Sequence, residues 1–272
     1  MSSHAPNSKM GAQPCAPTPT SFDGLILIDK PAGMTSHDVV DRVRRIAKTR
    51  RVGHAGTLDP FATGLLIVGI NKGTKMLTGL VGLDKTYQTT AMLGATSDTD
   101  DVEGIITNCQ LPIAHSSKSK SVISNQQSAI PPMRDDVEQA LDLFRGGYVQ
   151  TAPAFSAKKV GGKKLYELAR KGKMEGVVLP TKDVKIYDLH ITSYEWPMLS
   201  FDVSCSSGTY IRSLARDIGE ALHVGAYLTA LRRTRIGEFD VKEAKRLEKL
   251  NPENIEELIV KKGDPPDRPY AS

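Results

Sequence analysis

Asp59 is the residue of this chain whose surroundings most favour chemistry. It lies in the segment Gly-Thr-Leu-Asp-Pro at residues 56–60, which predicts a tight turn, and the apolar run 64–70 that follows predicts a buried strand. A carboxylate held rigidly beside a buried sheet can serve as a nucleophile, because its surroundings and not water set its reactivity. An Asp before Pro is also a common device for reversing the chain, and this stretch alone leaves that interpretation open.

Two further types of side chain join this carboxylate. Tyr87 lies in an expected strand at residues 85–94, and the segment Ser-Gly-Thr-Tyr-Ile-Arg at 207–212 places Tyr210 and Arg212 two residues apart at a strand-to-helix junction. An Arg beside a buried Asp keeps that carboxyl ionised, and a Tyr beside the pair can stack on a planar ring. Together these groups suit chemistry on an aromatic base of a nucleic acid, held in a pocket.

Basic residues form three separated clusters, and the net charge is +5. In one fold, three such clusters can form a continuous track that neutralises phosphates and gives steeply salt-dependent binding. Many basic surfaces are merely solvated, so the charge alone is a weak indication of an anionic partner. The clusters lie at residues 42–51, at residues 158–185 with Lys163 and Lys164, and at residues 232–235 with Arg232.

The sequence indicates neither a metal site nor a membrane segment. Cys15, Cys109 and Cys205 lie far apart and the six His are scattered, so we expect no metal, and free thiols in a reducing, cytoplasmic compartment. No apolar run approaches the roughly 20 residues that span a bilayer. Four acids at residues 98–103 lack the spacing of a calcium loop and predict a solvated polar loop.

The expected elements alternate irregularly between strand and helix. Because regular strand–helix–strand alternation is absent, we expect an α+β domain on a largely antiparallel sheet. Ser36 is the expected N-cap of the first helix. The expected strands span residues 24–29, 65–70, 85–94, 184–194 and 199–205, with 236–239 closing the sheet. The expected helices span residues 36–48, 74–80, 135–145, 164–171, 210–222 and 226–233.

We divide the chain into three parts. Residues 1–23 are rich in Ser, Pro and Ala and predict a disordered tail, and residues 24–239 form the expected catalytic domain. Within that domain, the polar and Ser-rich residues 108–133 predict a flexible insertion. Residues 240–272 predict a short extension with a charged helix at 242–250, which is too small for an independent domain.

Six segments of the chain resemble one enzyme family. They are LIDKPAGMTS at 27–36, GHAGTLDP with ATG at 53–64, KTY at 85–87, PAFSAKK with GKKLY at 153–166, SGTYIR at 207–212 and LRR at 231–233. In these segments the chain resembles the TruB family of pseudouridine synthases, the bacterial tRNA pseudouridine-55 synthases. The resemblance is specific because all six occur in family order over residues 23–239.

The resemblance implies a pseudouridine synthase fold, with a central, mostly antiparallel sheet flanked by helices, and chemistry without metal or cofactor. Asp59 would be the nucleophile that cuts the glycosidic bond of the T-loop uridine at position 55 of tRNA. The flipped-out base would then rotate and rejoin the sugar through carbon. Attack at ring C6 and attack at sugar C1′ both remain open. Tyr87 would stack on the base and take the proton from C5, and Arg212 would pair with Asp59.

The resemblance also implies which residues bind the base. Lys30 and Tyr210 would line the pocket, Leu231 would pack near the base, and His54 would help to hold the RNA loop in its flipped-out form. Without the family, Lys30 could equally be a surface charge in a turn, since Lys is mostly exposed. His54 could be a hydrogen-bonded turn residue and Leu231 a core residue.

The RNA itself would contact the basic clusters. Lys163, Lys164 and Arg232 are the residues of these clusters that we expect to bind it, although the Lys pair could also be a solvated helix face. We expect the T-arm stem-loop of tRNA as the substrate, no guide RNA, no membrane and a monomer. Many bacterial members end in a small RNA-binding PUA domain, and residues 240–272 are too few to form one.

Three other functions stay open beside this one. The first is an RNA-binding or folding factor that opens and refolds the tRNA elbow, and Asp59→Asn separates it from an enzyme because a pure binder keeps its effect. The second is a guide-RNA-dependent relative, which usually carries the PUA domain. The third is a small-molecule enzyme that uses Asp59, and three basic clusters fit it poorly.

Overall fold

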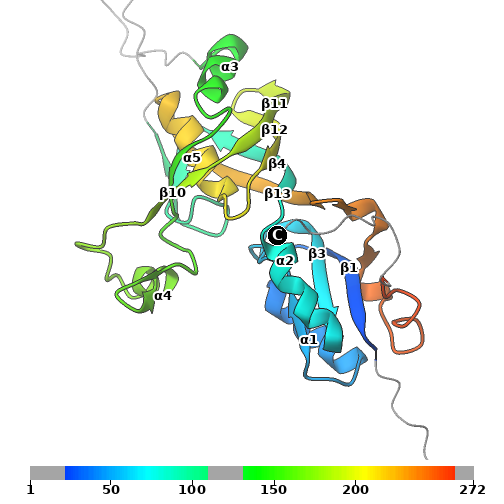
Figure 1. Cartoon of the computed structure of the whole chain (residues 1–272). Coiled ribbons are helices and arrows are strands. Elements are labelled where there is room, and N and C mark those ends of the chain that lie inside the picture. The colour runs from blue at the N-terminus through cyan, green and yellow to red at the C-terminus, as the bar shows by residue number, and fades with distance from the viewer. Residues whose placement is uncertain (1–21, 110–130, 261–272) are drawn as a thin grey trace, which may run out of the picture.

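One mixed sheet organises the molecule, whose computed structural model describes residues 22–109 and 131–260. Within these residues nine strands form the sheet, with β14 paired to β13, β2 paired to β3, and the order β11-β12-β4-β13-β3-β1-β15 along its main path (Figure 1). The strands are β1 (Gly24–Lys30), β2 (Val52–His54), β3 (Thr63–Ile70), β4 (Lys85–Leu93), β11 (Ile186–Glu195), β12 (Met198–Cys205), β13 (Ala226–Ile236), β14 (Phe239–Asp240) and β15 (Lys245–Arg246).

The predicted α+β class and the largely antiparallel sheet are confirmed. Only the pairs β13–β3 and β1–β15 of this sheet are parallel among the described residues. Almost all of the tail predicted at 1–23 lies outside the described residues, as does most of the insertion predicted at 108–133. Three two-stranded ribbons accompany the sheet: β5 (Ala95–Ser97) with β6 (Ile106–Asn108), β7 (Tyr148–Thr151) with β10 (Thr181–Val184), and β8 (Lys159–Val160) with β9 (Lys163–Lys164).

The helices lie around the sheet. They are α1 (Ser36–Ile46), α2 (Leu77–Val81), α3 (Arg134–Asp142), α4 (Leu165–Arg170) and α5 (Ile211–Ala221), with the 3₁₀ turns η1 (Asn71–Met76), η2 (Val241–Glu243) and η3 (Leu247–Lys249). In Figure 1, α1 and α2 lie beside β1 and β3, whereas α5 lies over β4, β12 and β13. No helix among residues 22–109 and 131–260 is long and apolar enough to cross a bilayer.

Helix α5 covers one face of the sheet with its apolar side. Leu214 and Ile218 of the helix share a core cluster with Phe201 of β12 and Leu228 of β13, and all four are buried. Alternate residues of β12 and β4 point toward this core, as a half-buried strand requires. The core therefore fixes α5, and with it the side chains at its N-terminal end.

The N-cap of helix α1 (Ser36–Ile46) lies one residue earlier than the sequence indicated. Its N-cap is Thr35, whose hydroxyl accepts from the backbone N–H of Asp38, while the Asp38 carboxylate accepts from the N–H of Thr35. Ser36, the predicted cap, is buried instead. Its hydroxyl accepts from the N–H of Leu58 at 2.9 Å and donates to the carbonyl of Leu58 at 3.2 Å. These two bonds tie the start of α1 to the loop that carries Asp59.

The helix predicted at 226–233 is wrong, because these residues form most of β13. This strand pairs with β4 on one edge and β3 on the other, and Figure 1 shows it as the long strand that joins the two ends of the sheet. Ala and Leu are good helix formers, but helix propensity is worth less than about 1 kcal/mol per residue, and backbone pairing on both edges outweighs it.

The last described residues complete the core beneath α1. β15 pairs with β1 at the edge of the sheet, and Leu247, Leu250, Ile255 and Ile259 are buried in the same cluster as α1. The charged helix predicted at 242–250 is therefore wrong. The segment instead forms η2, β15 and η3. This path lets β15 pair with β1 and lets Leu247 and Leu250 pack into the core.

Candidate active site

A cavity of about 680 Å³ lies between the β2–β3 loop, β4, β13 and the start of α5. The structure brings together in its lining five of the residues predicted from the sequence: Asp59, Tyr87, Tyr210, Arg212 and Leu231. The other five are not among the lining residues: Lys30, His54, Lys163, Lys164 and Arg232.

Asp59 and Arg212 form a two-pronged ion pair at this cavity. The Arg212 Nε donates to Oδ2 of Asp59 at 3.0 Å, and Nη2 donates to Oδ1 at 3.2 Å. The Arg212 side chain is 6% exposed, whereas that of Asp59 is 33% exposed. The carboxylate is thus oriented by a buried guanidinium and still accessible to a molecule in the cavity.

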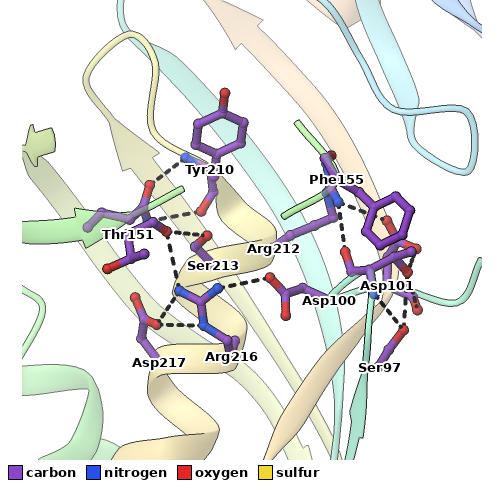
Figure 2. A network of polar contacts seen from close by, with 12 residues as sticks. Ser97, Asp100, Asp101, Thr151, Phe155, Tyr210, Arg212, Ser213, Arg216 and Asp217 are labelled. Carbon is purple, nitrogen blue, oxygen red and sulfur yellow. Dashed lines mark hydrogen bonds and ion pairs between the residues drawn. The ribbon is translucent and has the colours of Figure 1, made fainter. Parts of the chain in front are cut away.

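The remaining donors of Arg212 reach two other segments. Nη1 donates to the carbonyl of Thr99 at 2.7 Å and lies 3.4 Å from Oδ2 of Asp101, while Nη2 donates to the carbonyl of Phe155 at 3.1 Å. Figure 2 shows Arg212 close to Phe155 and Asp101. Because nearly every donor is used, the guanidinium has little freedom to turn away from Asp59.

The acidic segment 98–103 is only in part the solvated loop that its composition predicted. Asp98 and Glu103 are exposed, but Asp100 and Asp101 are buried, at 8% and 3% exposure. Both buried carboxylates pair with Arg residues of α5. The prediction fails for these two because their partners lie more than a hundred residues further along the chain.

Tyr87 lies in the cavity beside an Arg that the sequence did not single out as a site residue. Burial raises the pKa of the Tyr87 hydroxyl, and the charge of Arg233 beside it opposes that rise. Arg233 is 1% exposed, and it donates to the carbonyls of Leu65 at 2.8 Å and Gly56 at 3.1 Å. Arg233 shares a strand face with Leu231, so a correct strand prediction for β13 would have found it.

Lys30 lies beneath the Asp59 loop and not in the cavity. Its side chain is fully buried, and Nζ donates to the carbonyls of Pro31 at 2.9 Å, Met34 at 2.6 Å and Pro60 at 3.2 Å. Burial lowers the pKa of Lys30 to about 8, although nearby carboxylates, Asp59 first, favour the charged form. Its contacts are those of a residue that positions the loop.

His54 ends β2, two residues before Gly56 in the cavity wall. Burial lowers the pKa of His54, and the nearby His37 and Arg233 add to the effect. The rings of His54 and His37 meet edge to face with centroids 6.3 Å apart, and Nδ1 of His54 is buried without a hydrogen-bond partner. The ring is therefore set in place by its contact with His37 and by a backbone hydrogen bond at Gly56.

Lys163 and Lys164 belong to a basic rim that we define by these two residues with Tyr166 and Arg170. Tyr166 and Arg170 line the cavity. The Lys164 ammonium lies 5.4 Å and the Arg170 guanidinium 5.7 Å from the centroid of the Tyr166 ring. The helix predicted at 164–171 is confirmed as α4, and it carries this aromatic ring to the cavity.

Arg232 points away from Asp59, because successive side chains of a strand alternate between its faces. Both of its terminal nitrogens donate to the Asp29 carboxylate at 2.9 Å, and it lines a separate groove with Gln88 and Asp202. The structure thus engages Arg232 in a cross-strand ion pair. Its neighbour Arg233 occupies the position in the cavity.

The described residues contain no group of three or more His, Cys, Asp or Glu side chains that is arranged to hold a metal ion. Cys205 is buried, and burial raises the pKa of its thiol to about 11. The ionisable groups that line the cavity are carboxylates, three phenols and cations.

Two family models cover most of the chain. The model described as TruB family pseudouridylate synthase (N terminal domain) matches residues 44–133 and 114–211, and the model described as tRNA pseudouridylate synthase B C-terminal domain matches residues 212–259. Among curated relatives, the tRNA pseudouridine synthase B of Corynebacterium jeikeium is 43% identical, covering 89% of this chain and 77% of that protein. The enzyme of that name from Leifsonia xyli is 48% identical, covering 84% and 72%.

Solved structures show the same fold. A chain from a Cbf5–Nop10–Gar1 complex matches with a TM-score of 0.59 and 28% identity, covering 84% of this chain and 53% of that chain. A chain from an H/ACA RNP bound to a substrate RNA containing 2′-deoxyuridine gives a TM-score of 0.58 and 27% identity, covering 84% and 52%. The present chain therefore spans about half the length of those proteins.

Proposed function

We propose that this chain, which belongs to the TruB family of pseudouridine synthases, converts the T-loop uridine at position 55 of tRNA to pseudouridine. The relatives are tRNA pseudouridine synthases, and the chain is an isomerase of that kind. The proposal covers the position of the uridine, the role of Asp59 and base flipping. It also covers independence of metal, cofactor and guide RNA. The observation that supports the role of Asp59 is its two-pronged pair with Arg212 in the wall of the cavity.

The cavity suits one nucleotide drawn out of an RNA stack. A volume of about 680 Å³ lies in the range of small-molecule sites. Tyr87, Leu231 and Phe155 supply apolar and aromatic walls against which a planar base can pack. Enzymes that act on a base reach it by extrusion, so the uridine would enter this cavity flipped out of the T-loop.

Asp59 would act as the nucleophile in this cavity. Its carboxylate oxygen would attack either C1′ of the sugar or C6 of uracil, and the N1–C1′ bond would break. After the base rotates, C5 would bond to C1′, C5 would lose its proton, N1 would gain a proton, and Asp59 would be released unchanged. The product has the same atoms as the substrate, so the reaction needs no oxidant, reductant or added group.

Tyr87 would receive the C5 proton, and it could do so only as a phenolate. Burial raises the pKa of its hydroxyl, so this phenol is neutral at pH 7 in the free enzyme. The adjacent Arg233 favours the ionised phenol, so it would stabilise the phenolate that forms when Tyr87 gives its proton to N1 of the base, and this phenolate would accept the proton from C5. Arg233 would thus support proton transfer while its other bonds hold the Gly56 side of the loop.

The basic rim would hold the RNA around the flipped base. Its residues Lys164 and Arg170 flank the Tyr166 ring, a combination that suits phosphate contact and stacking of an unpaired nucleotide. We propose that the chain acts as a monomer in the cytoplasm and without a guide RNA. The family assignment and the tRNA synthase names of the relatives support that choice.

Mapping the modified base in a whole tRNA tests the proposed substrate. An unmodified tRNA transcript is incubated with the purified chain alone in EDTA, treated with a carbodiimide that marks pseudouridine, and read by primer extension. We expect one new stop, at position 55, and none in a transcript with cytidine there. A stop at another uridine would overturn the position, and modification only after guide RNA is added would overturn the stand-alone enzyme.

A further inference from the structure

A second Arg of α5 lies one helical turn beyond Arg212 and makes a parallel set of contacts. Arg216 donates from Nη1 to Oδ2 of Asp100 at 3.0 Å and from Nη2 to the carbonyl of Thr151 at 3.3 Å. Its Nε and Nη2 also donate to Oδ1 of Asp217, at 3.0 and 2.8 Å. Figure 2 shows the guanidinium between these three partners. Neither Arg216 nor Asp100 lines the cavity.

The partners of Arg216 belong to the same two segments that Arg212 holds. Asp100 lies between Thr99 and Asp101, both of which contact Arg212. The other segment is residues 151–155. Its Thr151 carbonyl accepts from Arg216, and its Phe155 carbonyl accepts from Arg212. Residues four apart on a helix share one face, so the two Arg side chains clamp both segments side by side.

The backbone at Asp100 is held in an unusual conformation. Its φ is +61°, a left-handed value that residues other than Gly adopt at a cost and retain where surrounding contacts enforce it. Three contacts enforce it here: the ion pair with Arg216, a backbone bond from the N–H of Leu228 to the Asp100 carbonyl at 3.0 Å, and one from the Asp100 N–H to the Ser97 carbonyl at 3.1 Å. This turn directs the carbonyl of Thr99 and the carboxylate of Asp101 toward Arg212.

Further bonds brace the second segment against α5. The Ser213 hydroxyl donates to the carbonyl of Thr151 at 2.8 Å. The Gln150 side chain accepts from the N–H of Tyr210 at 2.8 Å and donates to its carbonyl at 3.0 Å. The Asp100 and Arg216 side chains are 12% and 19% exposed, so water competes little for this junction.

We propose that Arg216 and Asp100 form a positioning pair that sets the orientation of the Arg212 guanidinium, and through it that of Asp59. This inference rests on the proposed function of the cavity. Neither residue touches the reacting atoms. The pair acts by fixing the Thr99 carbonyl, the Asp101 carboxylate and the residue 151–155 segment, on which Arg212 depends. Loss of the pair should slow the chemical step and leave RNA binding almost unchanged.

Arg216→Met in the full chain tests the pair, with tritium release from a T-arm stem-loop labelled at C5 of uracil as the readout. We expect kcat to fall by about tenfold to a hundredfold, as a small misplacement of catalytic groups does, and KM to stay within about threefold. Arg145→Met is the matched control, because Arg145 pairs with Glu138 and Asp142 on α3, outside the cavity. The control should keep the wild-type kcat.

A double variant separates positioning from simple stability. Arg216→Met leaves the Asp100 carboxylate buried without its cation, so we add Asp100→Asn and measure each kcat well below the melting temperature found by circular dichroism. A folded double variant whose kcat stays low supports the positioning pair. A folded single or double variant with at least half of the wild-type kcat overturns it, and so does an effect on KM alone. An inactive wild type would instead contradict the proposed function.

Discussion

Asp59 is fixed from both sides by residues that do not line the cavity. Ser36 of α1 exchanges two hydrogen bonds with Leu58, the residue before it. The buried ammonium of Lys30 donates to Pro60, the residue after it. Because α1 and β1 are parts of the core, the carboxylate is placed by the fold and then oriented by Arg212.

Lys30→Met should lower kcat by about tenfold or more and reduce stability. The substitution keeps an unbranched side chain but leaves the carbonyls of Pro31, Met34 and Pro60 without their donor, at a cost of about 1–3 kcal/mol for each unsatisfied buried group. Rates under saturating RNA and urea unfolding measure the two effects. Lys72→Met, which removes a Lys side chain that is 83% exposed, should change neither. If Lys30→Met keeps the wild-type kcat, Lys30 does not position the loop that carries Asp59.

Asp100 gives stability a pH dependence with a definite sign. Burial raises its pKa from 3.8 to about 6, against the opposing charges of Arg216 and Arg212. The folded state therefore binds this proton more tightly than the unfolded state. Wild type should gain stability relative to Asp100→Asn as the pH falls from about 6 to about 4, by at most about 3 kcal/mol. Urea unfolding of both proteins at pH 7.5, 6, 5 and 4 measures it. A relative loss over that range would mean that Arg216 outweighs burial.

At the scale of single residues, the sequence was sufficient for only some residues of the family segments, since Lys30, His54 and Arg232 do not line the cavity. Asp59, Tyr87, Tyr210, Arg212 and Leu231 all reach the cavity as predicted. The sequence was insufficient where a distant ion-pair partner decides whether a side chain is buried or exposed. Asp100 and Asp101 have the composition of a solvated loop, and only the fold brings α5 to them.

β13 controls the geometry of the cavity at the scale of elements. It pairs with β4 with two register shifts, between Leu228 and Ala230 and between Arg233 and Arg235. Bulges of this kind change the direction of the side chains beside them. Here they lie on either side of Leu231 and Arg233, which line the cavity. The sequence could not reveal this, because a segment rich in Leu, Ala and Arg reads as a helix until two neighbouring strands pair with it.

Gly64→Ala should disrupt the contact between β3 and β13. Gly64 has a φ of +101°, and a Cβ there would lie 2.3 Å from the carbonyl oxygen and 2.8 Å from the nitrogen of Arg233. Backbone on both sides cannot yield, so we expect a loss of about 3 kcal/mol or more and a large fall in activity. Thermal unfolding measures the loss. Gly79→Ala, with nothing within 4 Å of the new Cβ, is the control and should keep the wild-type melting temperature. Equal melting temperatures for the two variants would contradict the close approach.

At the scale of the whole molecule, the position of the basic rim relative to the cavity matters for RNA binding. The cavity opens beside the basic rim, where α4 projects away from the sheet (Figure 1). The far edge of the sheet carries the exposed Lys245 and Arg246 of β15, and the order of the strands separates them from β13. A net positive charge attracts RNA to the entire surface, whereas the rim should contribute the contacts near the flipped base.

Replacing both Lys163 and Lys164 by Ala should weaken T-arm binding and flatten its dependence on salt. Each lost phosphate contact lowers the slope of log Kd against log salt by about 0.7–0.9, so the pair should lower it by up to about 1.8. Filter binding from 50 to 300 mM salt measures the slope. Replacing Lys245 and Arg246 by Ala removes the same charge at the far edge and should leave the slope near that of wild type. An equal effect of both double variants would show that only net charge matters.

We propose above all that Asp59 is the nucleophile of a stand-alone pseudouridine synthase. Tritium release from a T-arm stem-loop labelled at C5 of uracil measures it most directly, with purified wild type and Asp59→Asn compared side by side without guide RNA. We predict stoichiometric release by wild type and none above background by Asp59→Asn, whose RNA affinity stays within about tenfold because phosphate contacts dominate binding. Release by Asp59→Asn at the wild-type rate would contradict the account.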